Sequence, residues 1–168
     1  MNIVVISGYF NPIHVGHLDY IEAAASLGDK LVVIVNNDHQ VKLKGSTPFM
    51  TAYDRMRIVG SIRGVDRVVW SIDKTGSVVE TLTSIYNEYC VEYFFDSMTF
   101  ANGGDRTKGN SPEDEYCQWR GIKTVYNVGG NKRRSSSEFL KGMTKPHKLS
   151  VGDVIIGKCN TTLKDTQK

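Results

Sequence analysis

The sequence lacks several features that would assign it to a well-known class of proteins. Its 168 residues include three cysteines, an odd number whose spacing fits neither a disulfide framework nor a zinc site. No apolar run approaches the ~18 residues that a membrane-spanning helix needs, and the net charge of +3 is too small to argue for nucleic acid by itself. We therefore expect a cytoplasmic protein with reduced cysteines that binds neither membranes nor nucleic acid.

Two common nucleotide-binding fingerprints are also missing. No G-x-G-x-x-G follows the first apolar run, and G-x-x-x-x-G-K-[ST] occurs nowhere. The N-terminal stretch "MNIVVIS" has neither a basic segment nor a cleavage site, so no secretion signal is expected. With 40% apolar and 23% charged residues, the composition is that of an ordinary globular domain.

What the sequence does contain is an alternation of short apolar runs with segments of helical periodicity. This alternation predicts an α/β fold, a Rossmann-like open parallel sheet of about five strands with helices on both faces. The start of one helix is marked especially well, by Ser111 as N-cap and Pro112 at the first helical position. The expected strands cover 3–7, 30–38, 66–71, 122–128 and either 91–97 or 98–102. The expected helices cover 15–27, 51–64, 77–90, 111–121 and 135–142.

The C-terminal part of the sequence has a different texture. We expect one domain over residues 1–142 and an extension over residues 143–168, which is too short to be a second domain. Within it, "VGDVIIGK" is compatible with one extra strand, and "CNTTLKDTQK" with a flexible tail.

The stretch "GYFNPIHVGH", residues 8–17, follows the first expected strand. Gly8 allows a tight turn and the close approach of a ligand. His14 and His17 lie three positions apart, so they share one face at the start of the next helix, where free N–H groups attract anions. The alternatives are one capping and one core histidine, or a zinc site, but no third ligand has suitable spacing. The pattern favours phosphate binding.

Two further loops follow later strands of the expected sheet. They are "NGGDR", residues 102–106, and "GGNKRRSSS", residues 129–137. Ligands of open parallel sheets bind beyond the carboxyl ends of the strands. We therefore expect these loops to share one site with residues 8–17.

These motifs resemble the cytidylyltransferase-like nucleotidyltransferases over residues 2–142. "GYFNPIHVGH" resembles their specific signature G-x-F-[DN]-x-x-H-x-G-H, and weaker likenesses follow in the same order. "LKGSTPFMTAYDRM" is similar to a K-G…P…R-M segment, and "RSSSEFL" to the start of a later helix. "IRGVDRVV" resembles the glycerol-3-phosphate cytidylyltransferase branch, whereas "GGDR" resembles the heptose-1-phosphate adenylyltransferase branch.

The resemblance implies transfer of a nucleoside monophosphate from CTP or ATP to the phosphate of a small sugar, polyol or similar acceptor. The acceptor attacks in line and pyrophosphate leaves. A phosphomonoester has a second pKa of about 6, so it needs no general base. Mg²⁺ is expected with the triphosphate, and a homodimer or larger oligomer is expected. "IRGVD" favours CTP, "GGD" and "LKG" favour ATP, and the balance lies slightly with CTP.

The resemblance also implies roles for individual residues. The catalytic residues would be His14, His17 and Lys44. The nucleotide would contact Gly8, Tyr9, Phe10, Arg55, Arg63, Gly103, Asp105, Ser135, Ser136 and Ser137. The acceptor would contact Asn11, Lys44 and Arg106, and no residue is expected to bind a metal directly.

Several of these residues could instead have an ordinary structural role. Lys44 and the two helix arginines could be ordinary solvated side chains, and the serines could serve as helix caps alone. Asn11 and Arg133 depart from the family pattern, because many relatives have Asp and Gly there. A non-catalytic nucleotide-binding module on the same fold is the alternative function. The short basic runs "NKRRSSS" and "KGMTKPHK" are better explained by a solvated surface than by nucleic-acid binding.

Overall fold

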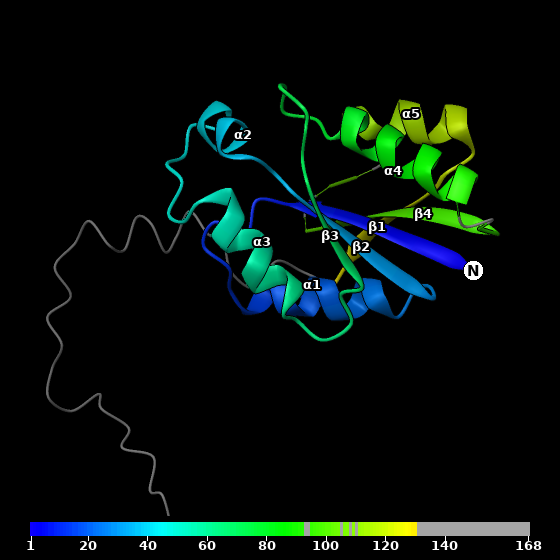
Figure 1. The fold of residues 1–168 in the computed structure, drawn as a ribbon, viewed down its shortest axis with the longest axis horizontal. Coiled ribbons are helices and arrows are strands. Elements are labelled where there is room, and N and C mark those ends of the chain that lie inside the picture. The colour runs from blue at the N-terminus through cyan, green and yellow to red at the C-terminus, as the bar shows by residue number, and fades with distance from the viewer. Residues whose placement is uncertain (93–94, 105, 108, 110, 131–168) are drawn as a thin grey trace, which may run out of the picture.

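The computed structural model describes residues 1–92, 95–104, 106–107, 109 and 111–130. Strands and helices alternate along the chain, and the strands form one parallel sheet in the order β3-β2-β1-β4-β5 (Figure 1). This confirms the expected α/β architecture with five parallel strands. The strands are β1 (Asn2–Gly8), β2 (Lys30–Val35), β3 (Arg67–Trp70), β4 (Ser97–Gly103) and β5 (Lys123–Val128). The helices are α1 (Val15–Ala25), α2 (Asp38–Leu43), α3 (Ala52–Gly60), α4 (Val79–Glu92) and α5 (Pro112–Arg120).

The two faces of the sheet carry different helices. Helices α1 and α3 cover one face, and α4 and α5 cover the other (Figure 1). The central strand β1 is buried on both faces, since Val4 and Ile6 pack under α1 while Ile3 and Val5 pack under α4. Such near-continuous apolar strands are typical of a parallel sheet covered by helices on both sides. No helix of the described ranges is long and apolar enough to cross a membrane.

The segment after β2 differs from the expectation. The predicted strand 30–38 ends at Val35, and residues 38–43 form α2 instead. The physical reason is Asn37, whose side-chain oxygen accepts a hydrogen bond from the Gln40 N–H at 2.9 Å and so caps a new helix. The Asn37 amide also donates to the Ser71 and Asp73 carbonyls, which fastens α2 to the loop after β3.

Two smaller differences concern the region before β4. The last turn of α4 extends through Glu92, and the strand covers 97–103, so the second of the two alternatives was the better one. Ser111 accepts from the Glu113 N–H and Pro112 begins α5, as expected. The expected helix 135–142 and the extension 143–168 lie outside the described residues.

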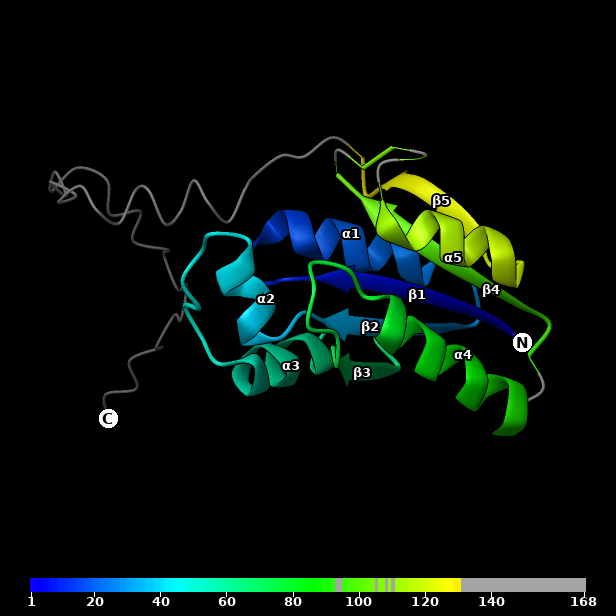
Figure 2. The ribbon, with the colours of Figure 1, turned by 90° about the horizontal axis from the view of Figure 1, so that it is seen from above.

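The strand order places a switch point between β1 and β4. From β1 the chain moves outward to β2 and β3, and then returns to build β4 and β5 on the other side of β1 (Figure 2). In open parallel sheets, the crevice beyond the carboxyl ends of two such strands is where ligands bind. The loops after β1 and β4 flank this crevice, and α2 lies at the same edge (Figure 1).

Candidate functional site

The loop after β1 is shaped by the packing of its own phenylalanine. Phe10 is fully buried and has a φ of 49°, in the left-handed region. Its ring lies against Gly8, where an added Cβ would be 2.8 Å from Phe10 Cζ. Gly8 is therefore needed inside the protein as well as for any ligand that approaches the loop.

The two histidines lie together at the start of α1. His14 is the N-cap residue, and its backbone N–H donates to His17 Nδ1 at 3.2 Å. The two rings stack with their centroids 3.8 Å apart, and the Phe10 ring lies 5.0 Å from that of His17. Because Nδ1 of His17 accepts, a neutral His17 carries its proton on Nε2. The backbone thus fixes His17 as an Nε2–H donor beside a helix N-terminus.

Asn11 joins this loop to the segment between α2 and α3. It is buried, and its Nδ2 donates to the Thr47 carbonyl at 2.9 Å while its Oδ1 accepts from the Phe49 N–H at 2.6 Å. A carboxylate could make only the second of these bonds, because it has no proton to donate. The structure therefore uses the amide of Asn11 within the protein, and the expected contact with an acceptor stays a prediction.

Lys44 is brought to the same loop by α2. It is the C-cap residue of that helix, and its Nζ lies 4.4 Å from the centroid of the Tyr9 ring. This is within the range of a cation–π contact. The expected juxtaposition of Lys44 with the loop after β1 is thus present, although the two are far apart in sequence.

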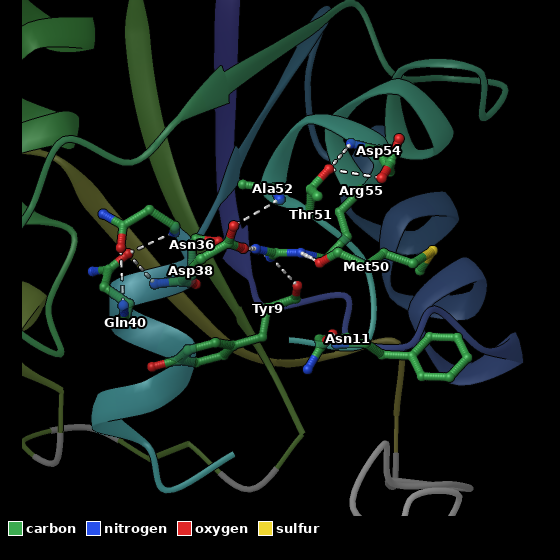
Figure 3. Close-up of polar contacts among 12 residues, drawn as sticks. Tyr9, Asn11, Asn36, Asp38, Gln40, Met50, Thr51, Ala52, Asp54 and Arg55 are labelled. Atoms are coloured by element: carbon green, nitrogen blue, oxygen red, sulfur yellow. Dashed lines mark hydrogen bonds and ion pairs between the residues drawn. The ribbon is translucent and has the colours of Figure 1, made fainter. Parts of the chain in front are cut away.

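Arg55 is a buried anchor behind the loop (Figure 3). Its Nη1 donates to the carbonyls of Tyr9 at 2.6 Å and Asn36 at 2.7 Å. Its Nη2 pairs with Asp38 Oδ1 at 2.5 Å, and its Nε donates to the Met50 carbonyl at 3.3 Å. The alternative of an exposed helix arginine is therefore wrong. Direct contact of Arg55 with phosphate stays a prediction, because most of its donors are engaged by the protein.

Arg63 is not brought to this site. It lies in the turn between α3 and β3, next to Asp66, whose carboxylate accepts from Lys30 Nζ at 2.7 Å and from the Leu31 N–H at 2.8 Å. Lys30 and Leu31 begin β2, so this turn lies at the amino edge of the sheet, opposite the loop after β1. The structure thus separates Arg63 from the histidines of the same chain, and "IRGVD" forms the entry to β3.

Gly103 ends β4 beneath α1. A Cβ at this position would lie 2.8 Å from atoms of the Tyr20 ring. Tyr20 is held in place because its hydroxyl donates to the Ala101 carbonyl at 2.6 Å, and burial raises the pKa of this hydroxyl well above its ordinary value. The glycine lets α1 and its two histidines lie close to the carboxyl end of β4.

Arg106 and Glu113 add charge beside Tyr9. Arg106 Nη1 lies 3.2 Å from Glu113 Oε2, and Glu113 Oε1 accepts from the Val78 N–H at 2.8 Å. Burial raises the pKa of Tyr9, while the positive charge of Arg106 lowers it and the negative charge of Glu113 raises it. The sequence does not single out Glu113, because nothing in "SPEDE" distinguishes it from its acidic neighbours. Its burial links α5 to the loop before α4.

The comparisons with known proteins agree with this arrangement. The cytidylyltransferase-like family model matches residues 5–155. The chain belongs to the cytidylyltransferase-like family. The match includes the loop with both histidines and extends beyond residue 142, where the domain was expected to end. The boundary at residue 142 stays a prediction.

Several curated proteins are similar to this chain over parts of their length. The chain is 45% identical over 76 residues to the FAD synthase of Pyrococcus horikoshii, an alignment that covers 45% of this chain and 50% of that protein. It is 37% identical over 111 residues to the bifunctional protein HldE of Haemophilus influenzae, which covers 61% of this chain and 23% of that protein. The chain thus spans half or less of the length of these relatives.

Two solved structures share the fold. The lipopolysaccharide core biosynthesis protein of Thermoplasma volcanium aligns with a TM-score of 0.59 at 22% identity, covering 76% of this chain and 94% of that one. A bifunctional NMN adenylyltransferase/ADP ribose pyrophosphatase of Francisella tularensis, complexed with AMP and a manganese ion, aligns with a TM-score of 0.58 at 17% identity. That alignment covers 84% of this chain and 41% of that one.

Some of the predicted site residues cannot be placed. Asp105, Arg133 and the serine cluster Ser135, Ser136 and Ser137 lie outside the described residues. Within the described part of the chain, no group of three or more His, Cys, Asp or Glu side chains is arranged to hold a metal ion.

Proposed function

We propose that this protein transfers a nucleoside monophosphate from a nucleoside triphosphate to the phosphate of a small acceptor, with release of pyrophosphate. The observation that carries the proposal is the pair formed by His14 and His17 at the N-terminus of α1, beside the switch point of the sheet. Membership in the cytidylyltransferase-like family supports the same reaction class. The alternative, a non-catalytic nucleotide-binding module, shares the fold but needs no turnover.

The chemistry needs positioned donors more than a base. The acceptor phosphate has a second pKa of about 6, so its oxygen is ionised at neutral pH and can attack directly. A bond forms between this oxygen and the α-phosphorus, the bond from the α-phosphorus to the bridging oxygen breaks, and pyrophosphate leaves with the electron pair. His17 Nε2–H and the N–H groups of α1 would stabilise the charge on the transferring group and on pyrophosphate.

Lys44 and Tyr9 would complete the site from the side of α2. Lys44 is exposed, and its Nζ lies 4.4 Å from the centroid of the Tyr9 ring. From this position the Lys44 ammonium would bind an anionic phosphate of the substrate. Arg106, whose positive charge opposes the rise that burial causes in the pKa of Tyr9, would offer a second cation to the acceptor.

Mg²⁺ would enter as part of the nucleotide substrate. The described residues offer no cluster of carboxylates for a protein-bound ion. Magnesium commonly keeps phosphate oxygens and waters as its ligands and needs few protein groups. The residues therefore fit a Mg²⁺–triphosphate complex that is held through its phosphates.

The base of the nucleoside triphosphate is inferred from less direct observations than the reaction class. The segment that favoured CTP, "IRGVD", lies at the amino edge of the sheet, where it cannot contact a base bound near the histidines of the same chain. FAD, which one relative is named for making, contains an adenine nucleotide. We therefore favour ATP over CTP, with a small phosphomonoester as acceptor. Assembly into a homodimer or larger oligomer stays a prediction that light scattering would test.

The test combines nucleotide binding with turnover. Thermal unfolding is measured with ATP, CTP, GTP and UTP, each with Mg²⁺, and a nucleotide at 100 times its Kd should stabilise the fold by about 2.7 kcal/mol. The responsive nucleotide is then incubated with a panel of sugar, polyol and other phosphomonoesters, and pyrophosphate release is followed. Binding without turnover on any acceptor would favour the non-catalytic module.

Substitution of the two histidines tests their proposed role more directly than nucleotide binding does. We expect His14→Ala and His17→Ala to stay folded and to lose turnover about a hundredfold to a thousandfold, the usual effect of removing one transition-state donor. Arg57→Ala is the matched control, since Arg57 is exposed on α3 and makes no contact with this site. Normal turnover in both histidine variants would contradict the proposed role.

A further inference from the structure

A cavity lies at the amino edge of the sheet, opposite the edge that carries the two histidines. It has a volume of about 410 Å³ and is bounded by the last turns of α4, the end of α5 and the start of β4. Figures 1 and 2 place the end of α4 and the start of β4 near the N-terminus of β1, at the opposite end of the sheet from α2. The volume lies within the range of small-molecule pockets, about 300–1,000 Å³. Nothing in the proposed reaction uses this cavity.

Among the described residues that line the cavity, the cationic side chain is that of Arg120, and one of its donors lacks a partner. Arg120, the last residue of α5, lines it, and the Arg120 Nε is buried with no hydrogen-bond partner among the described residues. Its guanidinium carbon lies 4.3 Å from the Trp119 ring centroid and 5.2 Å from that of Tyr86. A buried donor without a partner is unfavourable, and Arg120 is the residue of the described lining that can bind an anionic ligand.

A second buried donor lies on α5, the helix that ends at Arg120. The Tyr116 hydroxyl is buried and also has no partner among the described residues. Tyr116 lies close enough to Tyr86 to affect its titration: burial, a hydrogen bond with Cys90 and the field of Tyr116 raise the pKa of Tyr86, while Arg120 lowers it. Tyr86, Cys90 and Arg120 all line the cavity, so two polar side chains of α4 face the end of α5 there.

The rest of the cavity lining is mixed, because Asp96 and Ser97 are polar whereas Phe95, Met98 and Ile122 are apolar. Tyr86 and Phe95 meet edge to face with their ring centroids 5.6 Å apart, and Met98 and Ile122 also line the space. A ligand with a flat apolar body would be in contact with these rings while its charged end reaches Arg120. The planar guanidinium matches a carboxylate particularly well.

The charge balance argues for a single negative charge on the ligand. Arg120 is the one cationic side chain among the described residues that line the cavity, whereas Asp96, which also lines it, is exposed and pairs with the amino group of Met1. A phosphate monoester, with a charge near −2 at neutral pH, would leave one charge uncompensated beside Asp96.

We propose that this cavity is a binding site for a small monocarboxylate with a flat apolar body. Such a ligand differs in chemistry from the nucleotide and the phosphorylated acceptor of the proposed reaction.

The proposal is tested with benzoate as the probe. Isothermal titration calorimetry of the whole chain should show binding of benzoate, weaker binding of phenyl phosphate, and none of benzyl alcohol, which has the ring without the charge. Arg120→Gln should weaken benzoate binding about tenfold or more, since a hydrogen bond to a charged group is worth about 1.5–3 kcal/mol. Arg57→Gln, the same substitution on exposed α3, should leave it unchanged. Binding that survives in Arg120→Gln would overturn the proposal.

A measurement on the unaltered protein covers the case in which Arg120→Gln does not fold. Cys90 is a free, exposed cysteine that lines the cavity, while Cys117 is buried. Alkylation of Cys90 by iodoacetamide, followed by peptide mass spectrometry, should slow in the presence of benzoate and remain unchanged with benzyl alcohol. Equal rates with and without benzoate would overturn the proposed site, whatever the outcome for nucleotidyl transfer.

Discussion

The carboxyl and amino edges of this sheet are built in different ways. At the carboxyl edge, loops are fastened by buried polar side chains, among them Asn11, Arg55 and Glu113. At the amino edge, the turn into β3 is fastened by an ion pair between Lys30 and Asp66 that is largely open to solvent. Buried polar groups fix geometry because each lost bond is costly there, whereas exposed pairs contribute little. The edge that carries the proposed chemistry is the one whose loops are held rigidly.

The largest expected effect comes from the carboxyl edge, at Arg55. Arg55→Ala should lower the free energy of unfolding by about 3–5 kcal/mol, because it leaves Asp38 and three backbone carbonyls without their donor. Urea denaturation of the variant measures this loss. Arg57→Ala on the same helix should change stability by less than about 0.5 kcal/mol. Equal losses in the two variants would remove the distinction between the buried anchor and a surface arginine.

Asn11→Asp should have the next largest effect. The substitution keeps the acceptor for the Phe49 N–H but replaces the donor to the Thr47 carbonyl by a negative oxygen, so we expect a loss of about 1–3 kcal/mol. Chemical denaturation is the measurement, and Asn87→Asp, on the exposed face of α4, is the matched control. A variant as stable as the wild type would show that the loop after β1 does not need the amide.

Gly103→Ala tests a steric requirement at the same edge. The new methyl group would lie 2.8 Å from the Tyr20 ring, which is pinned by its hydrogen bond to Ala101, and overpacking of this kind costs about 1–3 kcal/mol. Thermal unfolding should show the loss at Gly103 and none at Gly76, where an added Cβ has nothing within 4 Å. If Gly76→Ala were the more damaging of the two, the proposed contact with Tyr20 would be wrong.

The smallest effect is expected at the amino edge, from Asp66→Asn. Burial tends to raise the pKa of Asp66, but its hydrogen bonds to Lys30 and the Leu31 N–H outweigh this and lower it below its ordinary value of 3.8. A lowered pKa in the folded state contributes stability above the unfolded pKa, and this contribution is lost as the pH falls through the folded value. The free energy of unfolding of the wild type should therefore exceed that of the variant by at most about 1 kcal/mol at pH 7. The gap should close in melting curves recorded below pH 3.8; a gap that widens on acidification would contradict the assignment.

The sequence allowed good predictions where one local cause dominates. The apolar run before Gly8 and the capping pair Ser111 and Pro112 each act within a few residues, so β1 and the start of α5 were found. Helix α2 was missed because Asn37 follows the apolar run of β2 without a break, and its capping role depends on Gln40 and on carbonyls more than thirty residues away.

For the site, the juxtaposition of His14 and His17 follows from their spacing, but the environment of the arginines does not. Arg55 has the sequence surroundings of a surface arginine, "DRMR", and only the tertiary fold shows that four acceptors converge on it. Arg63 belongs to a segment that resembles a functional motif, yet it follows the end of α3 at the other edge of the sheet. Helix α3 runs from the carboxyl edge of the sheet to the amino edge, and this direction decides the position of Arg63. The spacing of residues in the sequence does not reveal it.

The four bonds of Arg55 have a consequence for engineering. They connect the loop after β1, the entry to α2 and the segment before α3, so none of these three pieces keeps its shape without the others. The substrate preference of a relative could be transferred to this protein by exchanging loops. If only the loop after β1 is exchanged, the new backbone carbonyl at position 9 would not be placed to accept from Arg55. The smallest transplantable module is the set of residues 9–11, 36–38 and 47–55, exchanged together.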